Sequence, residues 1–163
     1  MQHLQETLTH IQESDSRLFR QTLGRFATGV TVITTMVEDS VHGMTLNAFC
    51  SVSLEPPLVL IAVEKHTHMH HLLAQNRRYT VSILSKDQEE LARHFAGRSH
   101  EGLQIPFVWH EGYPLIKGAI GYLTCQVIDI HPAGDHSLYI GQVEHLGSTE
   151  EQAPLLFYRG KYQ

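Results

Sequence analysis

The pattern of apolar and polar positions predicts one helix near the start of the chain and extended segments over most of the remaining residues. From residue 18 onward, apolar side chains recur at helical spacing, which predicts a helix that begins at Asp15 or Ser16 and ends near Gly29. The apolar face of this helix consists of Leu18, Phe19, Leu23, Phe26 and Ala27. Residues 1–14 are polar, and we expect them to form a flexible leader.

Strand signals occupy most of the chain after this helix. A β-branched run predicts a strand at residues 30–35, and residues 41–53 form a longer extended stretch that Gly43 interrupts. Further strands are expected at residues 58–63, 79–84, 118–130, 137–147 and 154–158, and short helices at residues 69–75 and 86–96. Residues 97–116 lack any period and are predicted to be a long ordered loop.

The order of these elements indicates the fold class. Helices and strands do not alternate as a doubly wound parallel sheet requires. The sequence therefore predicts a mainly β protein, an antiparallel Greek-key-like barrel with two to three appended helices. The 163 residues suffice for one such domain, which we expect to span residues 15–163.

Composition and charge change this picture by excluding several kinds of partner. The chain carries 12 Lys and Arg against 17 Asp and Glu, a formal net charge of −5, which leaves no electrostatic footprint for nucleic acid. No apolar run is long enough for a membrane span, and the polar start lacks the apolar core of a signal peptide. Cys50 and Cys125 form no CxxC pattern, so we expect reduced thiols in a cytoplasmic protein, with Cys50 in the core.

Candidate chemistry begins with the polar positions of residues 42–57. Gly43 allows the backbone to approach a ligand closely. Thr45, Asn47, Ser51 and Ser53 alternate and are predicted to share one face of a strand, where they would line a site for a polar heterocycle and its phosphate. The alternative is an edge strand whose polar face meets water.

Residues 66–71 contain four histidines, which raises the question of a metal site. Pairs of these histidines would face each other if the segment were helical. Zinc sites normally recruit a ligand from a distant segment, however, and nothing in the sequence specifies one. We therefore assign no metal site.

Four segments taken together resemble the flavin reductase family, the small reductase components of two-component flavin-dependent monooxygenases. They read FRQTLGRFATGVTV at residues 19–32, GMT through SVSLEPPLVL at 43–60, GDH and then GQV at 134–143, and PLLFYRGKY at 154–162. The four occur in order and span nearly the whole chain. The resemblance implies an FMN-binding split β-barrel, a homodimer, and an oxidoreductase that uses NADH or NADPH to reduce FMN or FAD for a separate oxygenase.

The resemblance also assigns a flavin site. The residues along the flavin ring and ribityl chain would be Gly43, Met44, Thr45, Leu46, Asn47 and Ala48, with Ser51 and Ser53 nearby. The phosphate would lie against Ala62, Val63, Glu64, Lys65 and Thr67, at the start of a helix. Family members often carry a hydroxyl or an Arg just after Thr67, where this chain has His68 and Met69. Either a protonated His68 takes that role, or the flavin is held loosely.

The nicotinamide side of the site involves other segments. Hydride transfer requires orientation and exclusion of water rather than an acid or a base, so we expect no catalytic triad. The resemblance assigns His136 to the nicotinamide cofactor; the alternative is a turn histidine bonded to its own loop. Tyr158, Arg159 and Tyr162 would close over the dinucleotide, although Arg159 also suits the surface end of a strand. Phe95 either walls the flavin pocket or belongs to the core.

Two other functions compete with the reductase. The same barrel could hold a flavin, or another cofactor such as heme, as an electron carrier without nicotinamide turnover. A metal-regulated protein built on the histidines of residues 66–71 rests on composition alone. His136 and the tail at residues 158–162 favour the enzyme.

Overall fold

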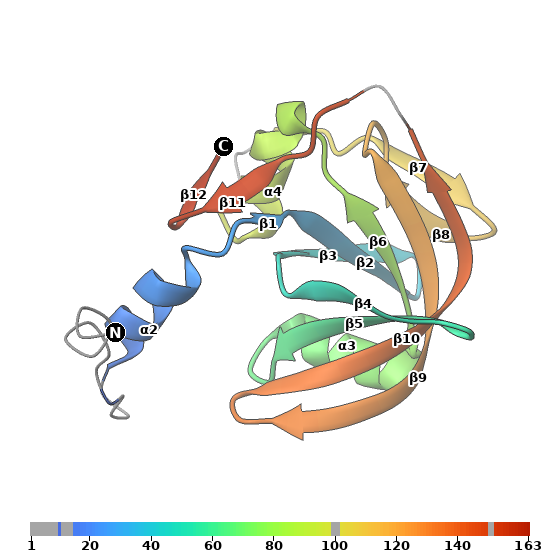
Figure 1. Cartoon of the computed structure of the whole chain (residues 1–163). Coiled ribbons are helices and arrows are strands. Elements are labelled where there is room, and N and C mark those ends of the chain that lie inside the picture. Colours follow the sequence, from blue (N-terminus) through green and yellow to red (C-terminus); the bar gives the residue numbers. More distant parts are fainter. Residues whose placement is uncertain (1–9, 11–14, 99–101, 150–151) are drawn as a thin grey trace.

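The computed structural model describes residue 10 and residues 15–98, 102–149 and 152–163, so the expected leader lies almost wholly outside the described residues. Its main feature is a curled antiparallel sheet of seven strands (Figure 1). These strands are β2 (Thr31–Val37), β3 (Ser40–Leu46), β4 (Phe49–Leu54), β5 (Pro57–Glu64), β6 (Arg78–Ile83), β9 (Gly121–Ala133) and β10 (His136–Ser148). Their spatial order is β3-β2-β6-β9-β10-β5-β4.

The two edges of this sheet approach each other. β3 and β4 are the edge strands, yet only Asn47 and Ala48 separate them in the sequence. The N–H of Ala62, on β5, donates a hydrogen bond of 3.0 Å to the carbonyl of Ala48. The sheet therefore curls into a barrel that is open along one seam, which agrees with the predicted antiparallel barrel.

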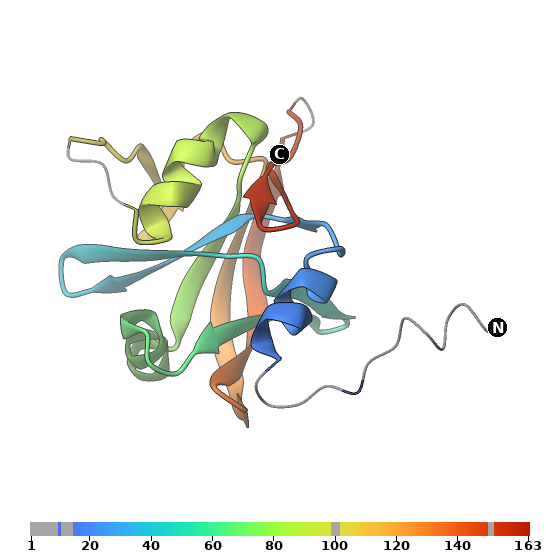
Figure 2. The ribbon, with the colours of Figure 1, turned by 90° about the vertical axis from the view of Figure 1, so that its left-hand side faces the viewer.

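Helices cover both faces of the β2–β3 hairpin. α3 (His68–Asn76) lies on one side, and α4 (Glu89–Phe95), which follows the short 3-10 helix η1 (Lys86–Gln88), lies on the other (Figure 2). Because successive side chains of a strand point to opposite faces, each side of the hairpin closes a separate core. The core beside α3 includes Ile33, Ile61, Leu73, Tyr79 and Tyr139, and the core beside α4 includes Val30, Val32, Leu84, Ala92 and Leu155.

The two ends of the described chain meet in a second, smaller sheet. It contains β1 (Thr28–Gly29), β11 (Leu156–Tyr158) and β12 (Lys161–Tyr162), and it adds a hairpin to the single strand predicted for the tail. The N–H of Arg159, in this hairpin, donates to the carbonyl of Gly24 at 2.8 Å. The hairpin thereby holds the end of α2 (Ser16–Leu23), which stops before the predicted Gly29 because β1 already begins at Thr28.

Three further expectations are wrong. The predicted loop at residues 97–116 contains a hairpin of β7 (Phe107–His110) and β8 (Tyr113–Ile116), whose four-residue strands are too short to show a period. The stretch at residues 41–53 breaks at Asn47 and Ala48 rather than at Gly43. Cys50 is exposed rather than in the core, because the preceding Phe49 packs against the core beside α3 and successive side chains of a strand point to opposite faces. Within the described part of the chain, the helices are too short or too polar to cross a bilayer.

Candidate functional site

The first part of the candidate site lies where β3 meets α4. Met44 packs against the core beside α3, so its neighbours Gly43 and Thr45 face α4 instead. The Thr45 hydroxyl donates to the carbonyl of Ala92 at 2.8 Å. A Cβ atom on Gly43 would lie 2.4 Å from a ring carbon of Phe95, so only glycine lets this ring lie against the strand. Phe95 also packs against the core beside α4, as the second interpretation of that ring expects. Its role as a wall of the flavin pocket stays a prediction.

The connection between β3 and β4 carries the next predicted residues. The Asn47 amide donates to the Thr28 hydroxyl at 3.1 Å, and the Ala48 carbonyl accepts from β5. Both residues are exposed. The predicted common face is wrong, because the strand that carries Thr45 ends at the next residue and Asn47 lies in the connection. In the following strand, a register shift falls between Ser51 and Ser53.

A cavity of about 150 Å³ brings these residues together with the end of the chain. Its lining consists of Val30, Thr45, Leu46, Asn47, Ala96, Phe157 and Tyr162. A second cavity of about 540 Å³ shares Ala96, Phe157 and Tyr162 and adds Arg93, Arg98, Gly160 and Lys161. We call the two together the C-terminal cleft. It joins predicted site residues that lie more than a hundred positions apart in the sequence.

Three cations at the C-terminal cleft are residues that sequence reasoning missed. Arg93, Arg98 and Lys161 all line its larger cavity. The Arg93 guanidinium lies 5.2 Å from the centre of the Tyr162 ring and also pairs with Glu89. Burial raises the pKa of the Tyr162 phenol, so the phenol keeps its proton at neutral pH. Nothing in the sequence marks these cations, because they come together only when α4 meets the last hairpin.

Tyr158 and Arg159 lie on the same hairpin, where their side chains contact each other. The Arg159 guanidinium lies 5.3 Å from the centre of the Tyr158 ring. Arg159 adopts a left-handed backbone conformation, with φ of 51°, at the turn between β11 and β12. The structure thus places Arg159 at an exposed strand end, beside the cleft rather than in the set of residues that lines it.

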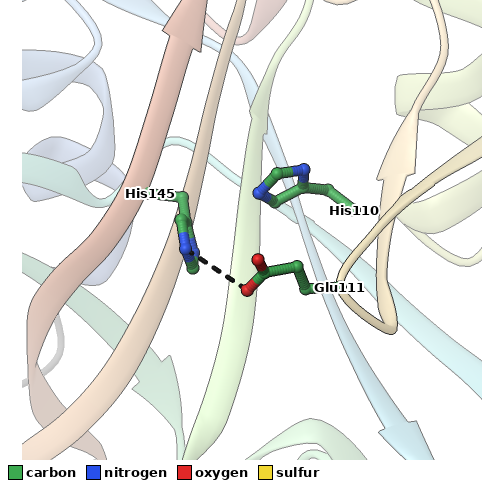
Figure 3. A group of neighbouring side chains, drawn as sticks. All are labelled: His110, Glu111 and His145. Atoms are coloured by element: carbon green, nitrogen blue, oxygen red, sulfur yellow. Dashed lines mark ion pairs between the residues drawn. The ribbon is translucent and has the colours of Figure 1, made fainter.

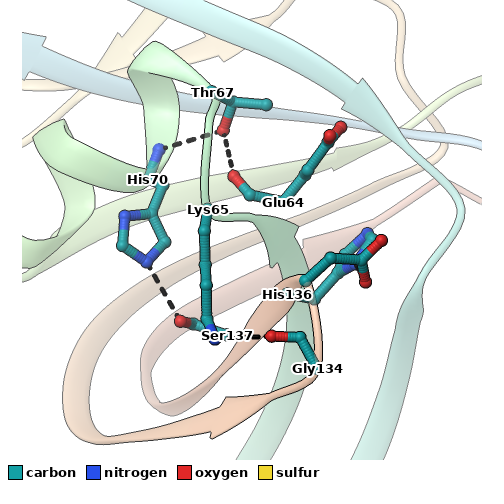
Figure 4. A network of polar contacts seen from close by, with 8 residues as sticks. Glu64, Lys65, Thr67, His70, Gly134, His136 and Ser137 are labelled. Carbon is teal, nitrogen blue, oxygen red and sulfur yellow. Dashed lines mark hydrogen bonds and ion pairs between the residues drawn. The ribbon is translucent and has the colours of Figure 1, made fainter.

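The second part of the candidate site is a polar network where β5 ends and α3 begins (Figure 4). The Lys65 amine donates to the Gly134 carbonyl at 2.5 Å, and the Lys65 N–H donates to the carbonyl of Asp135 at 2.9 Å. The Thr67 hydroxyl donates to the Glu64 carbonyl at 2.7 Å and accepts from the His70 N–H at 3.3 Å. We call this set the α3 network. Thr67 caps the helix, which satisfies one of the N–H groups at its start.

His136 lies beside the α3 network, directly across from Glu64 in the pairing of β10 with β5. Its Nδ1 atom is 2.7 Å from a carboxylate oxygen of Asp135. The hydrogen bond from the His136 ring, followed by the charge of that ring, holds the pKa of the Asp135 carboxyl below its usual range. His136 therefore is bonded to its own turn, and its ring is also partly exposed toward solvent.

The histidines of residues 66–71 do not converge. His66 precedes α3, His68 meets the ring of His42 edge-on at 5.3 Å, and the Nε2 atom of His70 is 3.0 Å from the Ser137 hydroxyl. Burial, with smaller contributions from His71 and Lys65, lowers the pKa of His70. Among the residues that the structure describes, these histidines do not bring three donor atoms close enough to share an ion.

The remaining predicted residues divide between core and surface. Val63 is fully buried in the core beside α3, so only its backbone is available to a ligand. The Leu46 carbonyl accepts from the Thr31 hydroxyl at 2.8 Å, while its side chain borders the C-terminal cleft. Ser51 is exposed on the edge strand β4.

Comparison of the sequence with known proteins identifies a family to which the chain belongs. The model of the flavin reductase like domain matches residues 23–163. An NADH-dependent flavin reductase from a Rhodococcus species is 49% identical over 147 residues, which cover 88% of this chain and 83% of that protein. The reductase component of 4-hydroxyphenylacetate 3-monooxygenase from Thermus thermophilus is 39% identical over 145 residues, which cover 89% of this chain and 93% of that protein.

A solved structure shows the same fold. The flavin reductase PheA2 in its native state superposes with a TM-score of 0.88 at 48% sequence identity. The match covers 91% of this chain and 97% of that one. The mainly β, open-barrel architecture is therefore that of a flavin reductase.

Proposed function

Because the chain belongs to the flavin reductase-like family, we propose that it is an NADH-dependent flavin reductase that supplies reduced flavin to a separate monooxygenase. The observation that carries this proposal is the C-terminal cleft. It unites Thr45 and Asn47 with the aromatic rings of Phe157 and Tyr162 and with three cations. Small polar groups, flat apolar walls and positive charge are what a flavin and a dinucleotide require of a site.

The donor chemistry of the cleft fits both cofactors. Asn47 offers an amide donor and acceptor to the edge of a heterocycle, and Phe157 and Tyr162 offer apolar surface. Arg93, Arg98 and Lys161 suit the phosphates of a dinucleotide, because a guanidinium matches an oxyanion in shape and charge. When bound, the flavin accepts the hydride that NADH gives up. The chain supplies orientation, charge and exclusion of water around that transfer.

The α3 network is the proposed phosphate end of the flavin site. Ala62, Val63 and Glu64 lead from the flavin-ring side to this network along β5, and the Ala48–Ala62 hydrogen bond ties the two regions together. The start of α3 contributes N–H groups to an anion. Lys65 and Thr67 are already bonded within the chain, so a phosphate would gain little from them without replacing those bonds. Loose binding, and therefore exchange of flavin with solution, follows from this arrangement.

His136 is the proposed contact to the nicotinamide. Its pairing across from Glu64 places it at the same end of β5 as the α3 network. The bond to Asp135 fixes the orientation of the ring without consuming its Nε2 atom. His136 thus positions the cofactor and exchanges no proton with it.

We also propose that two chains form a homodimer through α2. No residue of this helix is buried, and Leu18, Phe19, Leu23 and the following Phe26 are 43%, 51%, 56% and 77% exposed. An apolar helix face of this kind normally packs against protein. Light scattering should report twice the mass of one chain, and Phe19→Asp should shift that mass toward the monomer. A wild-type monomer would contradict the proposal.

A cytoplasmic location fits this chemistry. Both cysteines are free, and Cys50 is exposed, which suits a reducing compartment. NADH for the reaction is available in the same compartment.

The reductase is tested by mixing the purified protein with NADH or NADPH and free FMN or FAD. We expect the absorbance of the dihydronicotinamide to fall in the presence of NADH and at least one flavin, and the four combinations establish the preferred pair. Absence of turnover in every combination would overturn the proposal. A flavin that stays bound through dialysis, without turnover, would instead support an electron carrier.

A further inference from the structure

Among the described residues, the side chains of His110, Glu111 and His145 form a group whose donor atoms all lie within 4.8 Å of one another (Figure 3). His110 and Glu111 come from the β7–β8 hairpin, and His145 comes from β10, more than thirty positions later. None of the three is a residue of the proposed flavin or nicotinamide site. The group therefore calls for an explanation of its own.

A β-bulge in β10 brings its residues to the hairpin. The pairing of β10 with β9 shifts between Val143 and His145, which leaves Glu144 as the extra residue. In a regular strand, neighbouring side chains point to opposite faces. Here both Glu144 and His145 reach the hairpin: Glu144 accepts a hydrogen bond of 2.6 Å from the Tyr113 hydroxyl, and the ring of His145 lies 4.9 Å from that of His110. Bulges commonly redirect a side chain in this way.

The orientation of His145 directs one ring nitrogen toward the other two side chains of the group. Its Nδ1 atom is 2.9 Å from the hydroxyl of Thr124, a residue that is only 2% exposed. Its Nε2 atom points toward Glu111, whose carboxylate oxygen is 3.4 Å away. Metal-binding histidines usually hold one ring nitrogen on a neighbouring acceptor and present the other to the ion. Thr124 plays that part here.

The distances suit a tetrahedral ion. Bonds of about 2.0–2.1 Å to nitrogen and oxygen separate neighbouring ligand atoms by about 3.3 Å, close to the 3.4 Å between His145 and Glu111. The other separations reach at most 4.8 Å, and His110 and Glu111 are exposed, so their side chains can rotate to close the remainder. Two imidazoles and one carboxylate form a donor set that zinc uses together with a water molecule.

We propose that His110, Glu111 and His145 form a binding site for a divalent transition-metal ion of the zinc type, which joins the β7–β8 hairpin to β10. The ion would add to the hydrogen bond between Tyr113 and Glu144, which already links the same two segments. Binding should therefore rigidify the hairpin. The site stands apart from the proposed flavin chemistry, so its test does not depend on reductase activity.

The experiment titrates the full-length, chelator-treated protein with zinc chloride in a calorimeter. We expect one zinc ion per chain and no comparable response to magnesium chloride, because magnesium prefers oxygen ligands in an octahedron. Cobalt(II) should give the visible absorption of a tetrahedral site. Amide hydrogen exchange at residues 107–116 should slow when zinc is added.

Variants locate the ion. His145→Ala and Glu111→Gln should each weaken zinc binding by more than about tenfold, and Thr124→Val, which changes shape little, by about 10- to 100-fold. His131→Ala is the matched control: its Nε2 atom lies 3.0 Å from Asp129 in a histidine–carboxylate pair outside the three-residue group. Zinc binding should be unchanged in this variant.

Two results would overturn the proposal. One is equal zinc affinity in wild type, His145→Ala and Glu111→Gln. The other is zinc binding that His71→Ala abolishes, which would place the ion on the histidines at the start of α3 instead. If His145→Ala folds poorly, amide hydrogen exchange still tests the site. Exchange at residues 107–116 that slows on addition of zinc in wild type, but not in Glu111→Gln, would support it.

Discussion

The C-terminal cleft and the α3 network differ in how their polar groups are occupied. In the cleft, apolar packing of Phe157 and Tyr162 holds the walls. Arg93 is paired with Glu89, whereas Arg98 and Lys161 make no side-chain hydrogen bond or ion pair within the described part of the chain. In the network, Lys65 and Thr67 are already bonded to backbone carbonyls. A ligand can therefore reach Arg98 and Lys161 in the cleft without replacing an internal bond, whereas at Lys65 and Thr67 it must replace one. We therefore expect the proposed cofactors to gain more affinity from the cleft than from the network.

Gly43→Ala should have the largest effect of the variants considered, because it disturbs the packing of β3 against α4. The new Cβ would lie 2.4 Å from the Phe95 ring, and forcing it in should lower the free energy of unfolding by about 1–3 kcal/mol. Flavin affinity should fall with it, because the ring must move. Urea denaturation and a flavin titration measure both effects. Gly29→Ala, where an added Cβ meets nothing within 4 Å, is the control; equal stability loss in the two variants would contradict the packing argument.

Asn47→Asp tests the polar edge of the cleft. The carboxylate loses the amide donor that now bonds to Thr28 and adds negative charge beside the proposed flavin, so the dissociation constant should rise about tenfold. Flavin fluorescence quenching measures it. Gln75→Glu, which adds the same charge on an exposed position of α3, should leave the titration unchanged. An unaltered flavin titration in Asn47→Asp would remove this residue from the site.

Lys65→Met tests whether the α3 network binds the phosphate of FMN. The amine is partly exposed and shared with Gly134, so its loss should weaken FMN binding by no more than about fivefold. Riboflavin, which lacks the phosphate, should bind equally to both proteins. Lys86→Met serves as the control for a lost surface charge. If riboflavin binding fell as far as FMN binding, Lys65 would act on the fold rather than on the phosphate.

His136→Ala separates the nicotinamide side from the flavin side. Loss of one hydrogen-bonding ring should raise the KM for NADH by about threefold, with the flavin dissociation constant unchanged. Initial rates at saturating flavin give the first value. His131→Ala, on the paired strand, is the control. An effect confined to flavin affinity would contradict the assigned side.

His70→Gln should produce the smallest effect, and it depends on pH. The folded-state pKa of His70 is lowered from 6.5, so the unfolded chain binds the proton more readily. Stability from this residue is therefore present above about pH 6.5 and is lost as pH falls toward the folded pKa. Urea unfolding at pH 7.5, 6.5 and 5.5 should show a flatter profile in His70→Gln than in wild type. An identical profile, with exposed His66→Gln as the control, would contradict burial as the cause.

Local patterns predicted most elements because burial leaves a period in the sequence. The continuously apolar β5 and the alternating β9 and β10 were recognisable for this reason. The β7–β8 hairpin was not, because four residues are too few to show alternation, and Pro114 argues against a strand in the sequence. The break at Asn47 and Ala48 was missed because the residues on both sides, such as Thr45 and Phe49, favour a strand and outweigh a single Asn.

Residues of the candidate site show the same division. Motifs predicted Thr45, Asn47 and Tyr162, which line the C-terminal cleft, whereas they did not point to Arg93 and Lys161. One cation lies on a short helix and the other on the final strand, and no sequence pattern indicates that the two lie close together. They meet because the last hairpin pairs with β1 and packs beside α4.

By itself, the sequence determined the family and the antiparallel architecture, because each depends on local periods or on ordered motifs, and the same motifs predicted the residues on the ring side of the proposed flavin site. Only the tertiary structure decided that Gly43 accommodates Phe95, that Lys65 and Thr67 are bonded within the chain, and that His145 reaches the β7–β8 hairpin. These are contacts between distant segments. Their geometry depends on strand register and on a single bulge, which the order of residues does not display.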